Sequence, residues 1–359
     1  MLVDLVNNID PTVVTPMVCV TRSVMTLAPS LRDNIEVYKL DRNNTWDIRS
    51  FRQFGEIVRD SKVDLIHAHG YSSSHFVVAA KCLNLLSLPL IMHAHNSVPP
   101  ARRTRLISRM MINHFIGVAP EITDWALSFL RLPAKRVTLL GNAIDLSGYA
   151  HPTPIDVSQY FKTRPRFLGA VVANVRSVKN FEVLFRALAL SRFKSDVGIL
   201  VAGSLGDSEY VAQCRTLIQE LGLSENVIFL GTSSQIPELL AAVDFGLLSS
   251  DRESGPLALL EYMASALPFV VTQVGQISNS AAAGGVAGLV PKGDPLRFTK
   301  ALDELLELTT SQQRARGIAG KTFALRQFDI KERATHLQEL YTSLLSEKAG
   351  AKWKRNGAA

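Results

Sequence analysis

The sequence of 359 residues lacks an apolar run long enough to span a membrane and lacks a recognisable secretion signal. A spanning helix needs about 20 apolar residues, and the longest candidate, residues 76–92, is interrupted by Lys81, Asn84, Ser87 and Pro89. The first residues, MLVDLVNNID, have neither the basic start nor the apolar core of a signal peptide. We therefore expect a cytoplasmic protein.

Cysteine is also scarce. Its three residues, Cys19, Cys82 and Cys214, lie far apart, do not have the spacing of a zinc site, and cannot all pair in disulfides. This favours a reducing compartment. The hydrophobic content of 47% can fill a core in each of two domains of ordinary size.

Acidic residues are absent between Asp64 and Glu121. The basic residues in that interval are Lys81, Arg102, Arg103, Arg105 and Arg109. A patch of one sign attracts an anionic surface or substrate, so an anionic membrane is a candidate partner; an ordinary solvated helix face is the alternative. Nucleic acid is not expected, because no nucleic-acid motif or ladder of aromatic residues accompanies these charges.

Apolar runs alternate with helical patterns, which is typical of α/β domains with parallel sheets. Strands are expected at residues 12–21, 63–67, 90–93, 115–118 and 137–140, and then at 167–173, 197–202, 227–230, 245–248, 269–272 and 288–290. Helices are expected at residues 2–9, 48–60, 76–86, 102–113, 181–191, 207–221 and 330–345. In a parallel sheet, the ligand crevice lies beyond the carboxyl ends of the strands.

Residues 243–275 have the pattern of a strand, a polar loop, a helix and a second strand. Pro256 stands where the helix begins, a position that proline favours. The loop brings Glu253 to a helix N-terminus, where unpaired N–H groups and the helix dipole favour an anion such as phosphate. Glu253 and Glu261 together suit a phosphate-bearing ligand rich in hydroxyl groups. A solvated cap and an exposed helix carboxylate are the ordinary alternative.

This stretch resembles the E-x7-E segment of retaining nucleotide-sugar glycosyltransferases with GT-B architecture, family 4 in particular. The resemblance implies that Glu253 faces the hydroxyls of the transferred sugar and that Glu261 holds the nucleotide ribose. The other donor contacts that it implies here are Ser254, Gly255, Pro256 and Leu257. Pro256 has no backbone amide to donate where the family often has glycine.

The resemblance also implies two Rossmann-like domains. The N-terminal, acceptor-side domain comprises residues 1–150, a linker follows at 151–166, and the nucleotide-sugar domain comprises 167–328. A helix at residues 329–346 crosses back to the first domain and is followed by a frayed basic tail at 347–359.

Other segments carry the same resemblance. The sequence ANVRSVKNFEVL is similar to the family's Arg…Lys diphosphate clamp, which assigns Lys179 and, less directly, Arg176, because Asn174 takes the usual place of the arginine. Both cations could instead be merely solvated. The turn GSLGD at Gly203 resembles the glycine-rich turn beneath the nucleotide. Gly231 and Thr232 lie where the family's main-chain groups meet the base.

Four histidines lie near the ends of two expected strands: His67, His69, His93 and His95. The segment PLIMHAHN resembles the family's strand-end histidine beside the sugar. This assigns to His95, followed by Asn96, a hydrogen bond to the sugar and stabilisation of the separating charges. For the other three we expect packing or hydrogen bonding. A metal site is disfavoured, because no Asp, Glu or Cys accompanies them at ligand spacing.

The segment LLGNAID at residues 139–145 is similar to the family's NGID stretch. Ala143 replaces the glycine and would be strained if the backbone required positive φ there. The family usually begins with an apolar strand and a Gly-Gly loop, whereas this sequence begins inside the helix that follows them. We expect either that the natural protein starts about 15 to 25 residues upstream or that this chain is a degenerate, poorly active form.

The resemblance implies an enzyme that transfers a sugar, with retention, from an NDP-sugar to a saccharide or lipid-linked acceptor in bacterial-type surface polysaccharide synthesis. No cofactor or metal is expected, since Lys179, Arg176 and the helix start at Pro256 can stabilise the diphosphate. One alternative is a nucleotide-sugar-binding protein without catalysis. Another is a GT-B sugar-nucleotide epimerase, which a ribose-binding Glu261 fits poorly.

Overall fold

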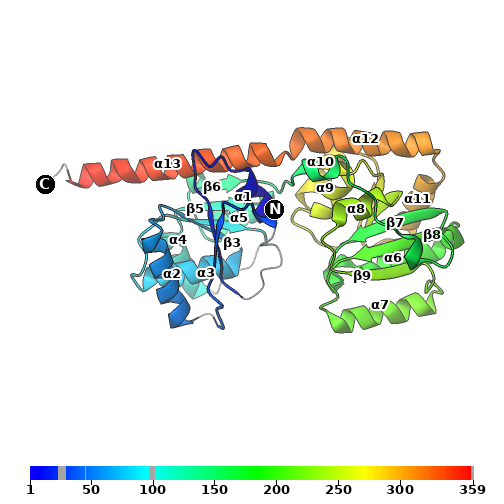
Figure 1. The fold of residues 1–359 in the computed structure, drawn as a ribbon, viewed down its shortest axis with the longest axis horizontal. Coiled ribbons are helices and arrows are strands. Elements are labelled where there is room, and N and C mark those ends of the chain that lie inside the picture. The colour runs from blue at the N-terminus through cyan, green and yellow to red at the C-terminus, as the bar shows by residue number, and fades with distance from the viewer. Residues whose placement is uncertain (23–29, 45, 97–101, 357–359) are drawn as a thin grey trace. The chain divides into compact units, whose positions relative to one another are not determined.

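The computed structural model describes residues 1–22, 30–44, 46–96 and 102–356. The chain forms two compact units: unit 1 contains residues 1–141 and 330–359, and unit 2 contains residues 142–329. Both units have parallel sheets with helices around them (Figure 1). The predicted α/β class with two Rossmann-like units is confirmed.

Unit 1 contains a two-stranded sheet, β1-β2, and a four-stranded sheet, β3-β4-β5-β6, all parallel. Its strands are β1 (Met17–Val20), β2 (Glu36–Lys39), β3 (Ile66–His69), β4 (Leu90–Ala94), β5 (His114–Gly117) and β6 (Val137–Leu139). Its helices are α1 (Leu2–Asn8), α2 (Ile48–Asp60), α3 (Tyr71–Cys82), α4 (Arg102–Met111), α5 (Pro120–Ser128) and α13 (Ile330–Asn356).

The core of unit 1 lies on one face of β3 and β4. Ala68 and Met92 belong to the same buried cluster as Phe51 of α2 and Phe76 of α3, whose rings stack at 4.7 Å. Successive side chains of a strand point to opposite faces. The residues that alternate with this core, the histidines of β3 and β4, therefore lie on the other face.

Unit 2 contains one six-stranded parallel sheet in the order β12-β11-β10-β7-β8-β9. Its strands are β7 (Phe167–Val172), β8 (Val197–Ala202), β9 (Val227–Gly231), β10 (Phe245–Leu248), β11 (Phe269–Thr272) and β12 (Leu289–Val290). Its helices are α6 (Phe181–Leu190), α7 (Ser208–Glu220), α8 (Ile236–Ala241), α9 (Leu257–Ala264), α10 (Gly275–Ala283), α11 (Pro295–Leu306) and α12 (Thr310–Gln327). In Figure 1, α7 lies on one side of this sheet and α9 on the other.

The division between the units differs from the predicted boundary at residue 150. Residues 142–166 belong to unit 2 because backbone and side-chain hydrogen bonds attach them to it. Asn142 Nδ2 donates to the carbonyl of Gly255 at 2.9 Å, and the Ile155 amide donates to the carbonyl of Glu238 at 3.2 Å. The segment predicted as the interdomain linker, residues 151–166, thus belongs to unit 2 and is hydrogen-bonded to it.

Several element ends also differ from the sequence prediction. The predicted strand 12–21 shortens to Met17–Val20, directly after Pro16, which cannot donate to a strand ladder. The strand predicted at 63–67 is shifted, so that His67 and His69 lie within β3. α13 continues past the predicted end at residue 346 to Asn356, because the following residues favour a helix; residues 357–359 lie outside the described ones.

Candidate active site

Four neighbouring strands of unit 2 end at the predicted donor residues. Because β10, β7, β8 and β9 are parallel and adjacent, their carboxyl ends meet at one edge of the sheet. The residues that follow them are Glu253 to Leu257 after β10, Arg176 and Lys179 after β7, Gly203 after β8, and Gly231 with Thr232 at the end of β9. The structure therefore brings the predicted donor residues of unit 2 to the same edge.

The loops after β7 and β10 are joined by an ion pair. Lys179 Nζ contacts Glu253 Oε1, and Ser250 Oγ donates to the same carboxylate oxygen at 2.7 Å. The Lys179 and Glu253 side chains are only 22% and 14% exposed. The predicted diphosphate ligand and the predicted sugar ligand are thus direct partners in this structure.

Asn180 fixes the conformation of the turn that carries Lys179. Its φ of 44° is left-handed, and its side chain caps α6 by accepting from the Val183 amide. Asn180 Nδ2 also donates to Asp251 Oδ1 at 2.9 Å, and the Asp251 amide donates to the carbonyl of Val178 at 3.0 Å. Sequence reasoning missed these loop contacts, although asparagine is one of the few residues that tolerate this backbone region.

Asn174, which stands where the family has arginine, has a structural partner. Its Oδ1 accepts from the Ser204 amide at 2.9 Å and so joins the loops after β7 and β8. Arg176 is exposed. Gly203 is required by close packing, since a Cβ there would lie 2.0 Å from the Ala173 carbonyl oxygen.

The start of α9 has open backbone donors. Pro256 is the N-cap rather than the predicted first helical residue, and no side-chain hydrogen bond caps the helix. The Gly255 carbonyl accepts a hydrogen bond from Asn142, and Leu257 is the first helical residue. The first N–H groups of a helix have no partner within it, so this end of α9 is suited to an anion. The donor contacts of Ser254 to Leu257 stay a prediction.

Glu261 lies on a face of α9 that does not point into the core. It is half-buried, and Tyr149 Oη donates to its Oε1 at 3.3 Å. The next residue, Tyr262, is fully buried and donates to the Leu247 carbonyl at 2.9 Å, while its oxygen accepts from the Val172 amide at 3.0 Å. Burial raises the pKa of Tyr262, so its hydroxyl stays protonated and anchors α9 to β7 and β10.

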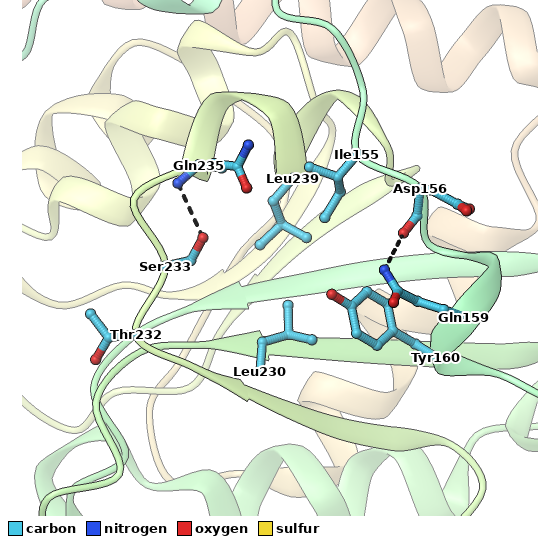
Figure 2. A pocket seen from close by; sticks show the side chains of 9 residues that line it. All are labelled: Ile155, Asp156, Gln159, Tyr160, Leu230, Thr232, Ser233, Gln235 and Leu239. Carbon is cyan, nitrogen blue, oxygen red and sulfur yellow. Dashed lines mark hydrogen bonds between the residues drawn. The ribbon is translucent and has the colours of Figure 1, made fainter.

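A cavity of about 210 Å³ lies beside the end of β9 (Figure 2). It is lined by Ile155, Asp156, Gln159, Tyr160, Leu230, Thr232, Ser233, Gln235 and Leu239. Thr232, predicted to contribute main-chain groups, also lines this cavity with its side chain. The contribution of residues 155–160, which were predicted to be linker, was not foreseen.

His95 belongs to unit 1 and follows β4 directly. Its Nε2 lies 3.3 Å from Nδ1 of His69, which fixes the orientation of the ring. Burial lowers the pKa of His95 to about 4 and, together with repulsion from His95, lowers that of His67 to about 3. His95 is therefore neutral at pH 7. Asn96 is exposed and precedes residues outside the described ones.

The basic interval maps in part to α4. Arg109 is exposed, and the guanidinium carbon of Arg105 lies 5.7 Å from the centre of the Phe129 ring. The side chains of Arg102 and Arg103 lie outside the described ones. Apolar side chains accompany these charges: Leu106 is 62% exposed and Met110 70%.

Two other expectations can be compared with the structure. Lys81 is not a free surface charge, because its ammonium group donates to the Leu88 and Met111 carbonyls. Ala143 is not among the described residues with positive φ, so its replacement of glycine causes no backbone strain.

Among the helices of the described residues, none combines the length and apolar character needed to cross a membrane.

Two α/β units with parallel sheets, the second with residues suited to an anion at one edge of its sheet, are features of the GT-B class. The family described as glycosyl transferases group 1 matches residues 157–322, and Glycosyltransferase Family 4 matches residues 7–147. The chain therefore belongs to the glycosyltransferases of family 4, group 1 type.

Individual relatives and solved structures agree with this membership. The chain is 23% identical over 333 residues to N-acetyl-alpha-D-glucosaminyl L-malate synthase of Bacillus anthracis, covering 89% of this chain and 84% of that protein. It is 21% identical to an Escherichia coli UDP-Gal:alpha-D-GlcNAc-diphosphoundecaprenol alpha-1,3-galactosyltransferase, with the same coverage. Anabaena Alr3699/HepE in complex with UDP and glucose has the same fold, with a TM-score of 0.78, 19% identity and 95% coverage of both chains.

Proposed function

We propose that the protein transfers a sugar, with retention of configuration, from an NDP-sugar to a saccharide or lipid-linked acceptor. The observation that carries this proposal is the pairing of Lys179 with Glu253 beside the uncapped start of α9. A cation and open helix amides suit a diphosphate, and a carboxylate suits sugar hydroxyls. One relative, whose name specifies UDP-Gal and a diphosphoundecaprenol acceptor, supports both the NDP-sugar donor and the lipid-linked acceptor.

In the proposed reaction, Lys179, Arg176 and the α9 amides hold the leaving diphosphate. Loss of one preorganised donor from an oxyanion hole costs about 3 to 4 kcal/mol. In this proposal the chain's own cations stabilise the diphosphate charge that a metal ion stabilises in other transferases. Glu261 binds the ribose, and the cavity near Thr232 is a candidate for the base. Glu253 and His95 bind the transferred sugar, and neutral His95 can donate one hydrogen bond.

We further propose that α4 places the protein on the inner face of the cell membrane, in surface polysaccharide synthesis. Exposed Leu106 and Met110 beside Arg109 give the helix apolar groups for the acyl boundary and a cation for anionic headgroups. A lipid-linked acceptor is held at such a surface, so membrane association would bring enzyme and acceptor together.

Incubation with a panel of UDP- and GDP-sugars, with and without lipid-linked saccharides, tests the transfer. We expect slow hydrolysis of one donor, faster transfer when the acceptor is present, and an α product from an α donor by NMR. Glu253→Gln should lower the rate roughly a hundredfold, whereas Glu220→Gln, which changes an exposed residue of α7, should leave it unchanged. Tight NDP binding without turnover would favour a catalytically inactive binding protein, and epimerised free sugar would favour an epimerase.

A further inference from the structure

Four histidine rings lie on the face of β3 and β4 opposite the apolar core of unit 1. The H-x-H spacing places His67 and His69 on the same face of β3. The parallel register sets His69 opposite His93 of β4, and His95 follows two residues later. The rings of His69 and His93 have their centres 4.7 Å apart, and those of His67 and His93 5.2 Å apart.

Three of these rings have nitrogens at distances suited to a shared ligand. One ring nitrogen from each of His67, His69 and His93 lies within 4.8 Å of those of the other two. His67 Nε2 and His93 Nδ1 are 3.2 Å apart. Two ligands of a tetrahedral zinc ion with bonds of 2.0–2.1 Å are about 3.3–3.4 Å apart, so this pair already has nearly the right separation.

One nitrogen of the cluster has no partner within the described residues. His93 is completely buried, and its Nε2 makes no hydrogen bond there. It is not the atom that faces His67: an ion held between the two rings would be bound by Nδ1 of His93, and Nε2, on the other side of the ring, would remain to donate its proton to a water.

The Nδ1 atoms of His67 and His69 have side-chain partners of their own. His67 Nδ1 contacts the hydroxyl of Tyr341 on α13, and His69 Nδ1 contacts His95 Nε2. Such outer contacts fix the orientation and the tautomer of a ligating imidazole. They leave Nε2 of His67 directed at His93.

We propose that His67, His69 and His93 form a binding site for a divalent transition-metal ion, with zinc as the best match. Three imidazoles are a donor set of open zinc sites, in which a fourth position remains for water or another ligand. Mg²⁺ and Ca²⁺ are excluded as natural guests, because they prefer oxygen ligands. The site lies wholly in unit 1 and does not depend on the proposed sugar transfer. A bound ion would hold the His69 ring that contacts His95.

The test is metal binding by the full chain after chelator treatment and dialysis. Co²⁺ is added as a visible probe and Zn²⁺ is titrated by calorimetry. We expect one equivalent of each to bind, with the intense visible bands of four-coordinate cobalt. His67→Ala and His93→Ala should each weaken binding at least tenfold. His151→Ala and His336→Ala, which change exposed histidines, should bind like the parent.

Thermal unfolding with and without Zn²⁺ separates lost binding from lost folding. Zinc should raise the Tm of the parent and of the two controls, and leave the Tm of folded His67→Ala unchanged. If the cluster variants do not fold, X-ray absorption of the zinc-loaded parent identifies the ligands of the ion instead. The proposal requires three imidazole ligands. Absence of binding by the parent, or a bound ion with fewer than three imidazoles, would overturn the proposal.

Discussion

Lys179 and Glu253 are separated by 74 residues in sequence, yet they form an ion pair between the loops after β7 and β10. The pair is largely shielded from solvent, and a shielded charge left without its partner costs several kcal/mol. If diphosphate binds Lys179 as proposed, the phosphate replaces the carboxylate as its partner. Donor binding would then release Glu253 toward the sugar.

The first prediction concerns Glu253→Gln. Because the change leaves Lys179 without its competing carboxylate, the bare nucleoside diphosphate should bind at least as tightly as it does to the parent. Turnover of the NDP-sugar should fall roughly a hundredfold, as for loss of a charge-stabilising group. Calorimetry and a hydrolysis assay measure the two quantities. A large loss of diphosphate affinity would contradict the role of Glu253 as a sugar ligand.

Glu261→Gln should have the opposite effect. Loss of a hydrogen bond to a charged group should weaken binding of the bare nucleoside diphosphate by about 1 to 3 kcal/mol. The same calorimetric titration with the 2′-deoxynucleotide provides a control. If Glu261 binds that ribose hydroxyl, the effects of the mutation and of the missing hydroxyl should not add; additive losses would place Glu261 elsewhere.

Gly203→Ala tests the packing of the loops independently of any ligand. Its Cβ would lie 2.0 Å from the Ala173 carbonyl oxygen, so the backbone must shift, and we expect unfolding free energy to fall by about 1 to 3 kcal/mol. Gly206→Ala is the matched control in the same loop, since its Cβ meets only the Ser204 hydroxyl, at 3.3 Å. Urea unfolding of both variants measures the difference in their unfolding free energies. Equal values would show that the backbone at Gly203 shifts without cost.

Liposome sedimentation tests the proposed membrane surface. We expect binding to vesicles with anionic lipid that weakens at high salt, with Arg105 and Arg109 contributing about 1 kcal/mol each. Leu106→Ser combined with Met110→Ser should reduce binding at every salt concentration. Leu325→Ser, which changes an exposed leucine of α12, is the control. Binding that does not change with salt concentration, or no binding to anionic vesicles, would exclude α4 as a membrane-binding surface.

Cysteine labelling tests the burial of two thiols. Burial raises the pKa of Cys19 and that of Cys214 to about 11, so at pH 8 about one molecule in a thousand carries the reactive thiolate at each site. Cys82 is exposed and should react first with iodoacetamide. Labelling of the two buried thiols should rise about tenfold per pH unit while the protein stays folded. Mass spectrometry of peptides measures each site, and equal rates at pH 8 would contradict the burial.

Strands made of buried apolar runs were predicted best, although β5, expected at 115–118, begins one residue earlier at His114. The fully buried apolar runs Val197–Ala202, Phe245–Leu248 and Phe269–Thr272 were predicted with their observed ends. β2, with the sequence EVYK and exposed ends, was missed because it has no apolar run. Helix α5 was also missed, although Pro120 at its start is a helix signal.

The candidate site was predictable as a set of positions but not as a set of contacts. Motif spacing placed Glu253, Lys179 and Gly203 after strands, and the parallel topology brings strand ends together. The partners of these residues depend on tertiary structure: Asn142 and Gly255 are 113 residues apart, and His67 and Tyr341 are 274 apart. The sequence places the four histidines near two strand ends and disfavours a metal site, and only the register of β3 and β4 shows which rings lie opposite one another.

The chain's path through the two units affects the order of its folding during synthesis. Unit 2 is complete at residue 329, whereas unit 1 still lacks α13 at that moment. At about 5 to 20 residues per second, Tyr341 is made about 14 to 55 s after His67. A nascent chain therefore has time to fold unit 2 while the histidine face of β3 is still without Tyr341, because α13 is synthesised only after unit 2.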